Sequence, residues 1–209
     1  MKTQFTRRQF LGAASAALSL VVAGLLAYHT SLAAPRVYHR VNSPAPCKPD
    51  REVLICLRNL SIKLTSEPAS FAIDISEFRQ RLAGTVESST EILVLELDDV
   101  EAERPPGAVW EVYVGLPANA TPDTQSVYYV GNVALYGAGI RSEARQGFKP
   151  AHFAFRINRA VQAALKSGQD NRLQVTFVPH GVLVDGRPSR PAVQSPVRLG
   201  QATLSIDIK

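Results

Sequence analysis

Residues 109–114 read Val109-Trp110-Glu111-Val112-Tyr113-Val114, a run of β-branched and aromatic residues with no helical period. β-Branched and aromatic residues at every second position, between clusters of Pro, Gly, Asn and Asp, predict antiparallel strands with one buried face. The sequence therefore predicts a mainly β fold, an antiparallel sandwich or a closed barrel. The same pattern recurs at residues 53–57, 60–64, 71–75, 92–97, 127–130, 133–136, 153–157, 173–178 and 197–208.

Only two stretches of the chain favour helices, and both are short. Ser76 is predicted to cap the first, which ends at Gly84. Asn158 is predicted to cap the second, in which residues 160–165 form an apolar stripe and Gly168 ends the helix. Small polar residues satisfy the free N–H groups at the start of a helix, and glycine adopts the conformation that ends one.

The amino terminus carries an export motif. A polar residue precedes the pair Arg7 and Arg8, and the hydrophobic residues Phe10 and Leu11 follow it. This order, before a long apolar run, is typical of a twin-arginine export signal. The alternative is an ordinary secretory signal that happens to hold two arginines. The motif implies contact with the twin-arginine export machinery, which carries proteins that have already folded.

Residues 11–28 contain no charge and form the expected signal helix. At about 18 residues the run is borderline for spanning a bilayer, which takes roughly 20. Small residues up to Ala33 favour cleavage there, and an uncleaved membrane anchor is the alternative. We therefore predict a signal peptide at 1–33, a proline-rich linker at 34–51 and a β-domain at 52–209. The expected location is periplasmic or secreted, and the membrane is contacted only if the signal is retained.

The net charge of +5 at first resembles that of a nucleic-acid binder. Three of the 23 Lys and Arg residues (Lys2, Arg7 and Arg8) lie in the signal segment, which holds none of the 18 Asp and Glu residues. The rest of the chain is therefore close to neutral, and its basic residues form no run or stripe. These features exclude nucleic-acid binding and an electrostatic membrane surface.

The chain has two cysteines, Cys47 in the linker and Cys56 in an apolar run. Export to an oxidising compartment favours a disulfide between them, which would tie the linker to the first strand. Two free thiols and a soft-metal pair are the alternatives. Without a neighbouring His or Met, this pair is weak evidence for a metal.

Residue patterns that carry catalysis are missing from the sequence. His39, His152 and His180 are the histidines after the signal, and their spacing matches no helical metal pair. No nucleophile elbow, phosphate loop or dinucleotide fingerprint occurs, so we predict no catalytic, metal or cofactor site. Four carboxylates within residues 98–103 are interpreted as a solvated acidic loop, and His180 as exposed or locally hydrogen-bonded.

Five blocks of the sequence, in order, resemble the C-terminal β-domain of bacterial and plant tyrosinases and polyphenol oxidases. The resemblance covers residues 52–209 and is strongest from residue 91 onward. Where plant enzymes have Lys-Phe-Asp-Val, this chain has Trp110-Glu111-Val112. The blocks are Trp110–Pro117, Tyr129–Gly137, Phe155–Asn158, Leu173–Pro179 and Val197–Gly200.

The resemblance implies an accessory module without the oxidase. In the family, a helical domain holds two coppers with six histidines, and the β-domain covers that site, blocks substrate entry and assists folding. This chain has four histidines in all, so no metal ligand carries over. The resemblance implies a non-enzymatic module that caps, escorts or helps to fold a separate tyrosinase-like copper oxidase.

Tyr136, near the end of the second block, is the predicted partner contact, because aromatic side chains are common anchors at interfaces. The plainer interpretation of Tyr136 is a half-buried hairpin aromatic. A rival hypothesis for the whole protein needs no oxidase: a self-standing periplasmic β-sandwich that binds a small ligand or a component of the cell envelope.

Overall fold

The chain divides into two units, Met1–Leu32 and Ala33–Lys209. The first unit lies wholly outside the described residues, and so do Arg7, Arg8, Phe10 and Leu11 of the export motif. No helix in the described part of the chain is long and apolar enough to cross a membrane. The computed structural model describes residues 36–38, 51–137, 139–141, 148–168, 171–180, 183–184, 187–188 and 193–208.

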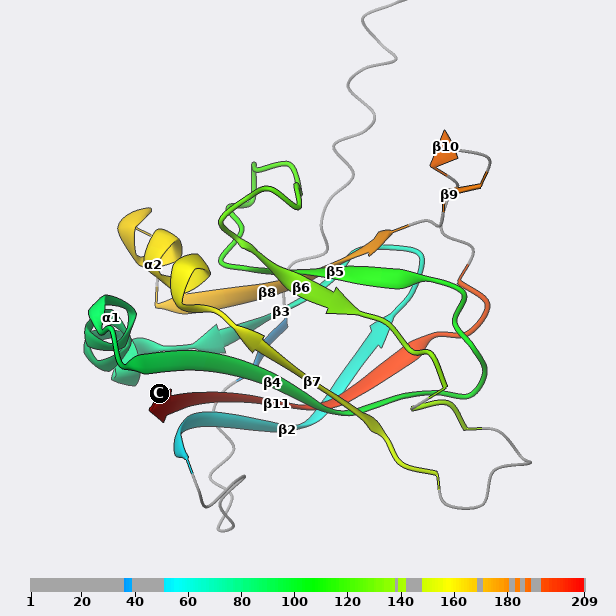
Figure 1. The fold of residues 1–209 in the computed structure, drawn as a ribbon, viewed down its shortest axis with the longest axis horizontal. Coiled ribbons are helices and arrows are strands. Elements are labelled where there is room, and N and C mark those ends of the chain that lie inside the picture. Colours follow the sequence, from blue (N-terminus) through cyan, green and yellow to red (C-terminus); the bar gives the residue numbers. More distant parts are fainter. Residues whose placement is uncertain are drawn as a thin grey trace, which may run out of the picture. The chain divides into compact units, whose positions relative to one another are not determined.

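Two large sheets form most of the described part of the second unit (Figure 1). Sheet I has the order β1-β3-β8-β5-β6 and sheet II the order β2-β11-β4-β7. Neighbouring strands are antiparallel, apart from the parallel pair β1 and β3. The strands of sheet I are β1 (Arg36–Tyr38), β3 (Ala69–Asp74), β5 (Val109–Val114), β6 (Tyr129–Val133) and β8 (Arg172–His180). Those of sheet II are β2 (Glu52–Leu64), β4 (Glu91–Ala102), β7 (Ala151–Arg156) and β11 (Val197–Ile208), and a separate pair joins β9 (Leu183–Val184) to β10 (Arg187–Pro188).

One hydrophobic core lies between the two sheets, which confirms the predicted sandwich; the barrel is wrong, because both sheets are open. The alternation seen in the sequence directs Leu93, Leu95 and Leu97 of β4 inward, where all three are fully buried. Trp110 of β5 enters the core from the other sheet, and its indole N–H donates to the carbonyl of Thr65 over 2.9 Å. Each large apolar side chain buried in this way contributes about 1.5–3 kcal/mol.

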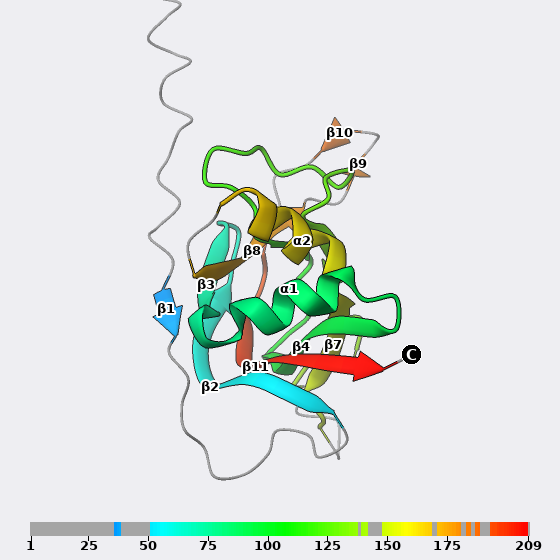
Figure 2. The ribbon, with the colours of Figure 1, turned by 90° about the vertical axis from the view of Figure 1, so that its left-hand side faces the viewer.

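The helices cover one end of the sandwich, as Figure 2 shows from that side. A 3₁₀ turn, η1 (Ser76–Phe78), leads into α1 (Arg79–Glu87), and α2 (Asn158–Lys166) lies beside α1. Both predicted helices are therefore present, but three details were wrong. Ser76 does not cap the first helix: it lies inside η1, and no side chain caps η1 or α1. Gly84 lies inside α1 and does not end it. Asn158 does not cap α2: its side chain accepts from the backbone N–H of Leu93 over 2.8 Å, which ties α2 to β4.

Long strands in sheet II correct two further predictions. The stretches 53–57 and 60–64 are one strand, β2, and β4 continues through the predicted acidic loop as far as Ala102. Asn59 on β2 and Asp99 on β4 have φ values of 56° and 54°, so the strand pattern shifts by one residue at each. Asn and Asp adopt this left-handed conformation more readily than other residues with side chains. The core-facing apolar positions that show this shift are 55, 57, 60, 62 and 64 on β2, 93, 95, 97, 100 and 102 on β4, and 197, 199, 202, 204 and 206 on β11.

Gly200 of β11 lies between these two irregular residues. Leu199 and Gln201 pair with Val100 and Asp98 of β4, which places Gly200 opposite Asp99. The pairing of β11 with β2 shifts at the same point. A Cβ atom on Gly200 would lie 2.7 Å from the Cβ of Asp99, so β11 approaches β4 too closely there to carry a side chain.

Arg81 of α1 joins the helical end to two strands of sheet II. Its guanidinium donates to Glu52 of β2 over 2.6 Å and to Glu91 of β4 over 2.8 Å. These hydrogen bonds, together with the positive charge of Arg81, lower the pKa of both carboxyl groups below the ordinary value of 4.5. The same two carboxylates raise the pKa of Arg81.

We predict that Gly200→Ala lowers the free energy of unfolding by about 1–3 kcal/mol, because the added methyl overlaps Asp99. Gly84→Ala is the matched control: a Cβ added there would have no atom within 4 Å, and Ala favours a helix by about 0.5–1 kcal/mol over Gly. Urea denaturation of the three proteins measures both changes. Equal stability of Gly200→Ala and the parent protein would contradict the close approach.

We also predict an acid-sensitive contribution from Arg81. Since the folded-state pKa values of Glu52 and Glu91 are lowered, their stabilisation is complete above pH 4.5 and is lost as the pH falls through the lowered values. Arg81→Gln should therefore lose less stability than the parent protein between neutral pH and pH 3. Denaturation curves at several pH values measure this difference, with Arg104→Gln in the β4–β5 loop as control. Parallel pH profiles for the parent and Arg81→Gln proteins would contradict it.

Candidate functional site

Tyr136 lies in the turn that follows β6, and its side chain is 87% exposed. The residue before it, Leu135, is buried in the core. The plainer interpretation of Tyr136 as half-buried is therefore wrong. An exposed tyrosine next to a buried leucine gives this turn an aromatic ring on the outside and an anchor on the inside.

Backbone hydrogen bonds fasten the chain after Tyr136 to the end of β4. The N–H of Ala102 donates to the carbonyl of Gly139 over 2.7 Å, and the N–H of Arg141 donates to the carbonyl of Ala102 over 2.8 Å. Gly139 has a φ of 73°, and a Cβ there would lie 2.6 Å from the carbonyl oxygen of Val100. Only glycine fits such a position. Tyr136 is thus held between β6 and this anchored segment.

Two charged side chains and one aromatic side chain lie in contact near the turn. Arg141 donates to the Glu101 carboxylate over 2.8 Å, and its guanidinium carbon lies 4.9 Å from the ring centroid of Phe148. The Arg141 side chain is more than half exposed. Glu101 belongs to the predicted acidic loop, which is instead the last part of β4 as far as Ala102.

A second polar group lies on the outer face of sheet I. Tyr113 donates to Glu111 over 2.7 Å, and the other carboxylate oxygen of Glu111 lies 3.2 Å from Nδ1 of His180. Burial and the Glu111 carboxylate raise the pKa of the Tyr113 phenol, so Tyr113 stays protonated and donates. His180 is exposed and makes a local contact, in agreement with the sequence. Spacing of two residues along β5 could have indicated that Glu111 and Tyr113 share a face.

A third group lies on the outer face of sheet II. His152 contacts Asp98 over 2.6 Å and lies 3.7 Å from Glu96. Arg51 pairs with Glu96 over 2.9 Å and with Asp207 over the same distance, so the nearly buried Glu96 carboxylate is compensated by a guanidinium. Among the described residues, no group of three or more His, Cys, Asp and Glu side chains is arranged to hold a metal ion.

Cys56 also lies on the outer face of sheet II. It pairs with Thr203 of β11, whose hydroxyl lies 3.9 Å from Sγ of Cys56. Cys47 falls outside the residues that the structure describes, so the disulfide between the two stays a prediction.

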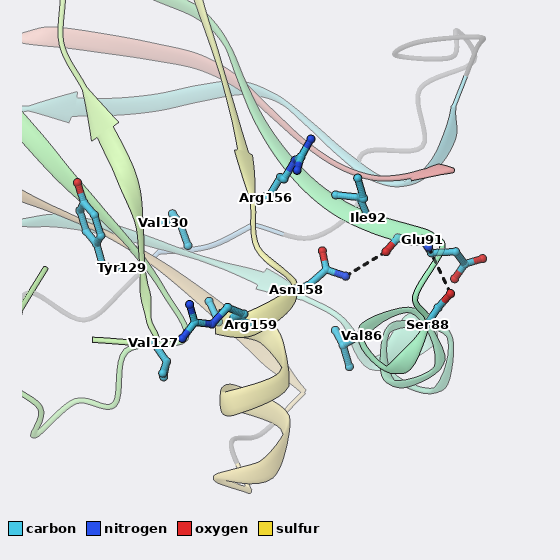
Figure 3. Close-up of a pocket in the computed structure, with 11 residues that line it drawn as sticks. Val86, Ser88, Glu91, Ile92, Val127, Tyr129, Val130, Arg156, Asn158 and Arg159 are labelled. Atoms are coloured by element: carbon cyan, nitrogen blue, oxygen red, sulfur yellow. Dashed lines mark hydrogen bonds between the residues drawn. The ribbon is translucent and has the colours of Figure 1, made fainter. Parts of the chain in front are cut away.

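A pocket of about 470 Å³ opens between the two helices and the ends of three strands (Figure 3). Arg156 at the end of β7 and Arg159 in the first turn of α2 supply its positive charge. Val127 and Val130, near the start of β6, contribute apolar surface. No pattern in the sequence predicted this pocket. The one feature of the sequence that could have indicated it is a pair of arginines three residues apart, at the junction of a strand and a helix.

Comparisons with solved structures find polyphenol oxidases and a tyrosinase. A latent aurone synthase (polyphenol oxidase) from its natural source is 12% identical, with a TM-score of 0.48, over 83% of this chain and 30% of that chain. Latent apple tyrosinase is 11% identical, with a TM-score of 0.41, over 82% of this chain and 29% of that chain. The chain thus spans about 30% of the length of these structures.

A comparison with curated proteins finds no match. A family model described as a domain of unknown function (DUF7868) matches residues 55–188. The match runs from the first long strand of sheet II past β8, and it includes both helices and the Tyr136 turn. Since these residues are more than half of the chain, the protein belongs to the DUF7868 family of domains of unknown function.

Proposed function

We propose that this protein is an exported, non-catalytic accessory module that binds a separate tyrosinase-like dicopper oxidase and caps, escorts or helps to fold it. The observation that carries the proposal is the presentation of Tyr136. Its ring is almost fully exposed, and the backbone on either side is held by β6 and by the hydrogen bonds to Ala102. A rigidly held aromatic ring loses little conformational entropy on binding, which suits an anchor residue.

The histidine content is the reason for assigning catalysis to the partner and not to this chain. A dicopper site of the tyrosinase kind needs six histidines, and the whole chain has four. The chemistry would therefore belong to the partner, and this chain would act through contact alone. Arg141 and Phe148, which lie beside each other near the anchored segment, add a positive charge and an apolar ring to the proposed contact surface.

Export by the twin-arginine route is part of the proposal. The route carries folded proteins, so a module that binds its partner in the cytoplasm could bring it across the membrane in the bound state. The proposed final location is the periplasm or the medium, and a Cys47–Cys56 disulfide would form there.

The proposed contact predicts that the protein co-purifies with a separately encoded six-histidine oxidase of the same organism and lowers its phenol oxidation. Tyr136→Ala should weaken the complex at least tenfold, about the loss expected for an interface anchor. Tyr136→Phe should bind nearly as well as the parent, because it keeps the ring. Calorimetry on the purified partners measures the dissociation constants.

Ile208→Ala is the matched control for this experiment. Ile208 is 82% exposed, and it pairs with Glu91 at the end of β4 that lies away from Ala102. Its replacement should leave binding unchanged. Failure to co-purify with any such oxidase, or equal binding by Tyr136→Ala, would overturn the proposed contact. Stoichiometric copper and oxygen uptake with phenols by this protein alone would overturn the non-catalytic role.

The proposed export predicts that replacing both Arg7 and Arg8 by Lys removes the protein from the periplasmic fraction, because the receptor reads the arginine pair. Lys2→Gln, which removes one charge outside the pair, should be exported normally. Immunoblots of cell fractions measure this, and non-reducing peptide mapping of the exported protein should find Cys47 linked to Cys56. Unchanged export of the Arg7 and Arg8 double variant would instead indicate an ordinary secretory signal.

A further inference from the structure

A second pocket, which we call the strand-end pocket, lies at the end of β4 that holds the Tyr136 segment. Its volume is about 270 Å³. Ala102 and Arg141 both line it, and the backbone hydrogen bond between them anchors the chain after Tyr136. The helices lie at the other end of β4 (Figure 1). The strand-end pocket therefore adjoins the segment that positions Tyr136.

Three charged side chains of this pocket lie side by side on the outer face of sheet II. Arg198 of β11 pairs in register with Lys63 of β2 on one side and with Glu101 of β4 on the other. Val197 and Leu199, the neighbours of Arg198 along β11, are buried in the core. The alternation of a strand therefore turns Arg198 and its two register partners outward. Directly opposite residues have Cβ atoms about 4.5–5.5 Å apart, so two positive charges are adjacent here.

The carboxylate in this row already has a partner. Oε2 of Glu101 accepts from Nε of Arg141 over 3.0 Å and from Nη2 of the same residue over 2.8 Å. Among the described residues, neither Lys63 nor Arg198 makes an ion pair or a hydrogen bond. Glu103 is the other carboxylate that lines the pocket, so three cations face two carboxylates. The strand-end pocket thus has a positive net charge.

The pair formed by Lys63 and Arg198 is unfavourable for the protein on its own. Like charges directly opposite each other on neighbouring strands destabilise a sheet. Proteins break such local rules mostly at functional sites. Both residues are exposed, so their charges can reach a molecule that covers this face. An acidic partner surface would turn the repulsive pair into an attractive contact.

Exposure of the two cations also favours a protein surface over a small free anion as the partner. Water weakens the attraction between exposed charges, and such pairs contribute little. A protein that docks on the Tyr136 turn would exclude water from the adjoining pocket and strengthen the attraction there. Charges at the rim of an interface mainly speed association and make it sensitive to salt.

We propose that the partner surface that receives Tyr136 carries Asp or Glu side chains that lie over the strand-end pocket and are attracted by Lys63 and Arg198. This inference rests on the proposed function and adds the charge of the partner's contact surface. Arg141 links the two contacts, because it lines the pocket and belongs to the anchored segment that follows Tyr136.

The first test needs no partner. Lys63→Gln removes the repulsion from Arg198, so it should raise the stability of the free protein at low ionic strength, about 0.01 M, and the gain should vanish near ~1 M salt. Lys166→Gln is the matched control: it removes the same charge at the end of α2 and should give no gain. Urea denaturation measures both. A Lys63→Gln protein no more stable than the parent at low salt would overturn the proposal.

The second test measures binding to the six-histidine oxidase. Replacing both Lys63 and Arg198 by Gln should weaken the complex about tenfold at low salt and make its affinity less dependent on salt. The control replaces Arg159 and Lys166 of α2 by Gln, which removes the same net charge at the helical end. It should bind as the parent does at every salt concentration. Tyr136→Ala should bind more weakly but keep the salt dependence of the parent.

The outcomes separate this inference from the proposed function. Parent-like affinity and salt dependence of the Lys63 and Arg198 double variant, with weaker binding by Tyr136→Ala, would overturn the acidic contact and leave the partner role standing. Tighter binding by the double variant would also overturn the acidic contact. Absence of any complex between the parent protein and the oxidase would overturn both.

Discussion

The close approach of β11 to β4 at Gly200 and Asp99 is the constraint on which the rest of sheet II depends. Asn59 and Asp99 leave the regular strand conformation on either side of it, and buried positions on all three strands shift by one residue at this level. Irregularities of this kind increase the bend and twist of a sheet. Beyond the bend, Val100 and Ala102 of β4 turn inward and receive the Gly139 segment. The position of the Tyr136 turn therefore follows from a contact several residues away.

The alternating pattern in the sequence predicted the sandwich and most of its strands, because burial of one face repeats every second residue. It failed where the period itself shifts. The alternation of apolar residues breaks after Leu57, and this break looks like a turn between two strands. Nothing in the neighbouring sequence shows that it is instead an irregularity at Asn59 within one strand. The matching breaks on β4 and β11 are far away in sequence, and only their pairing shows that one strand continues. Asn158 was misread for a similar reason: its partner, Leu93, belongs to another element.

The candidate site was predicted in part. Tyr136 could be singled out because it ends a block that resembles a known family, but its exposure depends on Gly139 and Ala102, whose contact is not local. The pocket beside the helices could not be predicted, since its arginines and its apolar wall come from segments far apart in the sequence. A sequence also does not show which arginines form ion pairs within the protein and which do not. Only the folded chain shows which charges the protein itself neutralises.

The course of β4 has a consequence for how the molecule could be used. Glu91 at its start lines the pocket beside the helices, and Ala102 at its end holds the Tyr136 segment. A strand of this length spans on the order of 35 Å. The pocket and the Tyr136 turn therefore lie at opposite ends of one strand. Because β4 pairs with β11 along its whole length and with β7 along part of it, any influence of one site on the other would pass through sheet II as a whole.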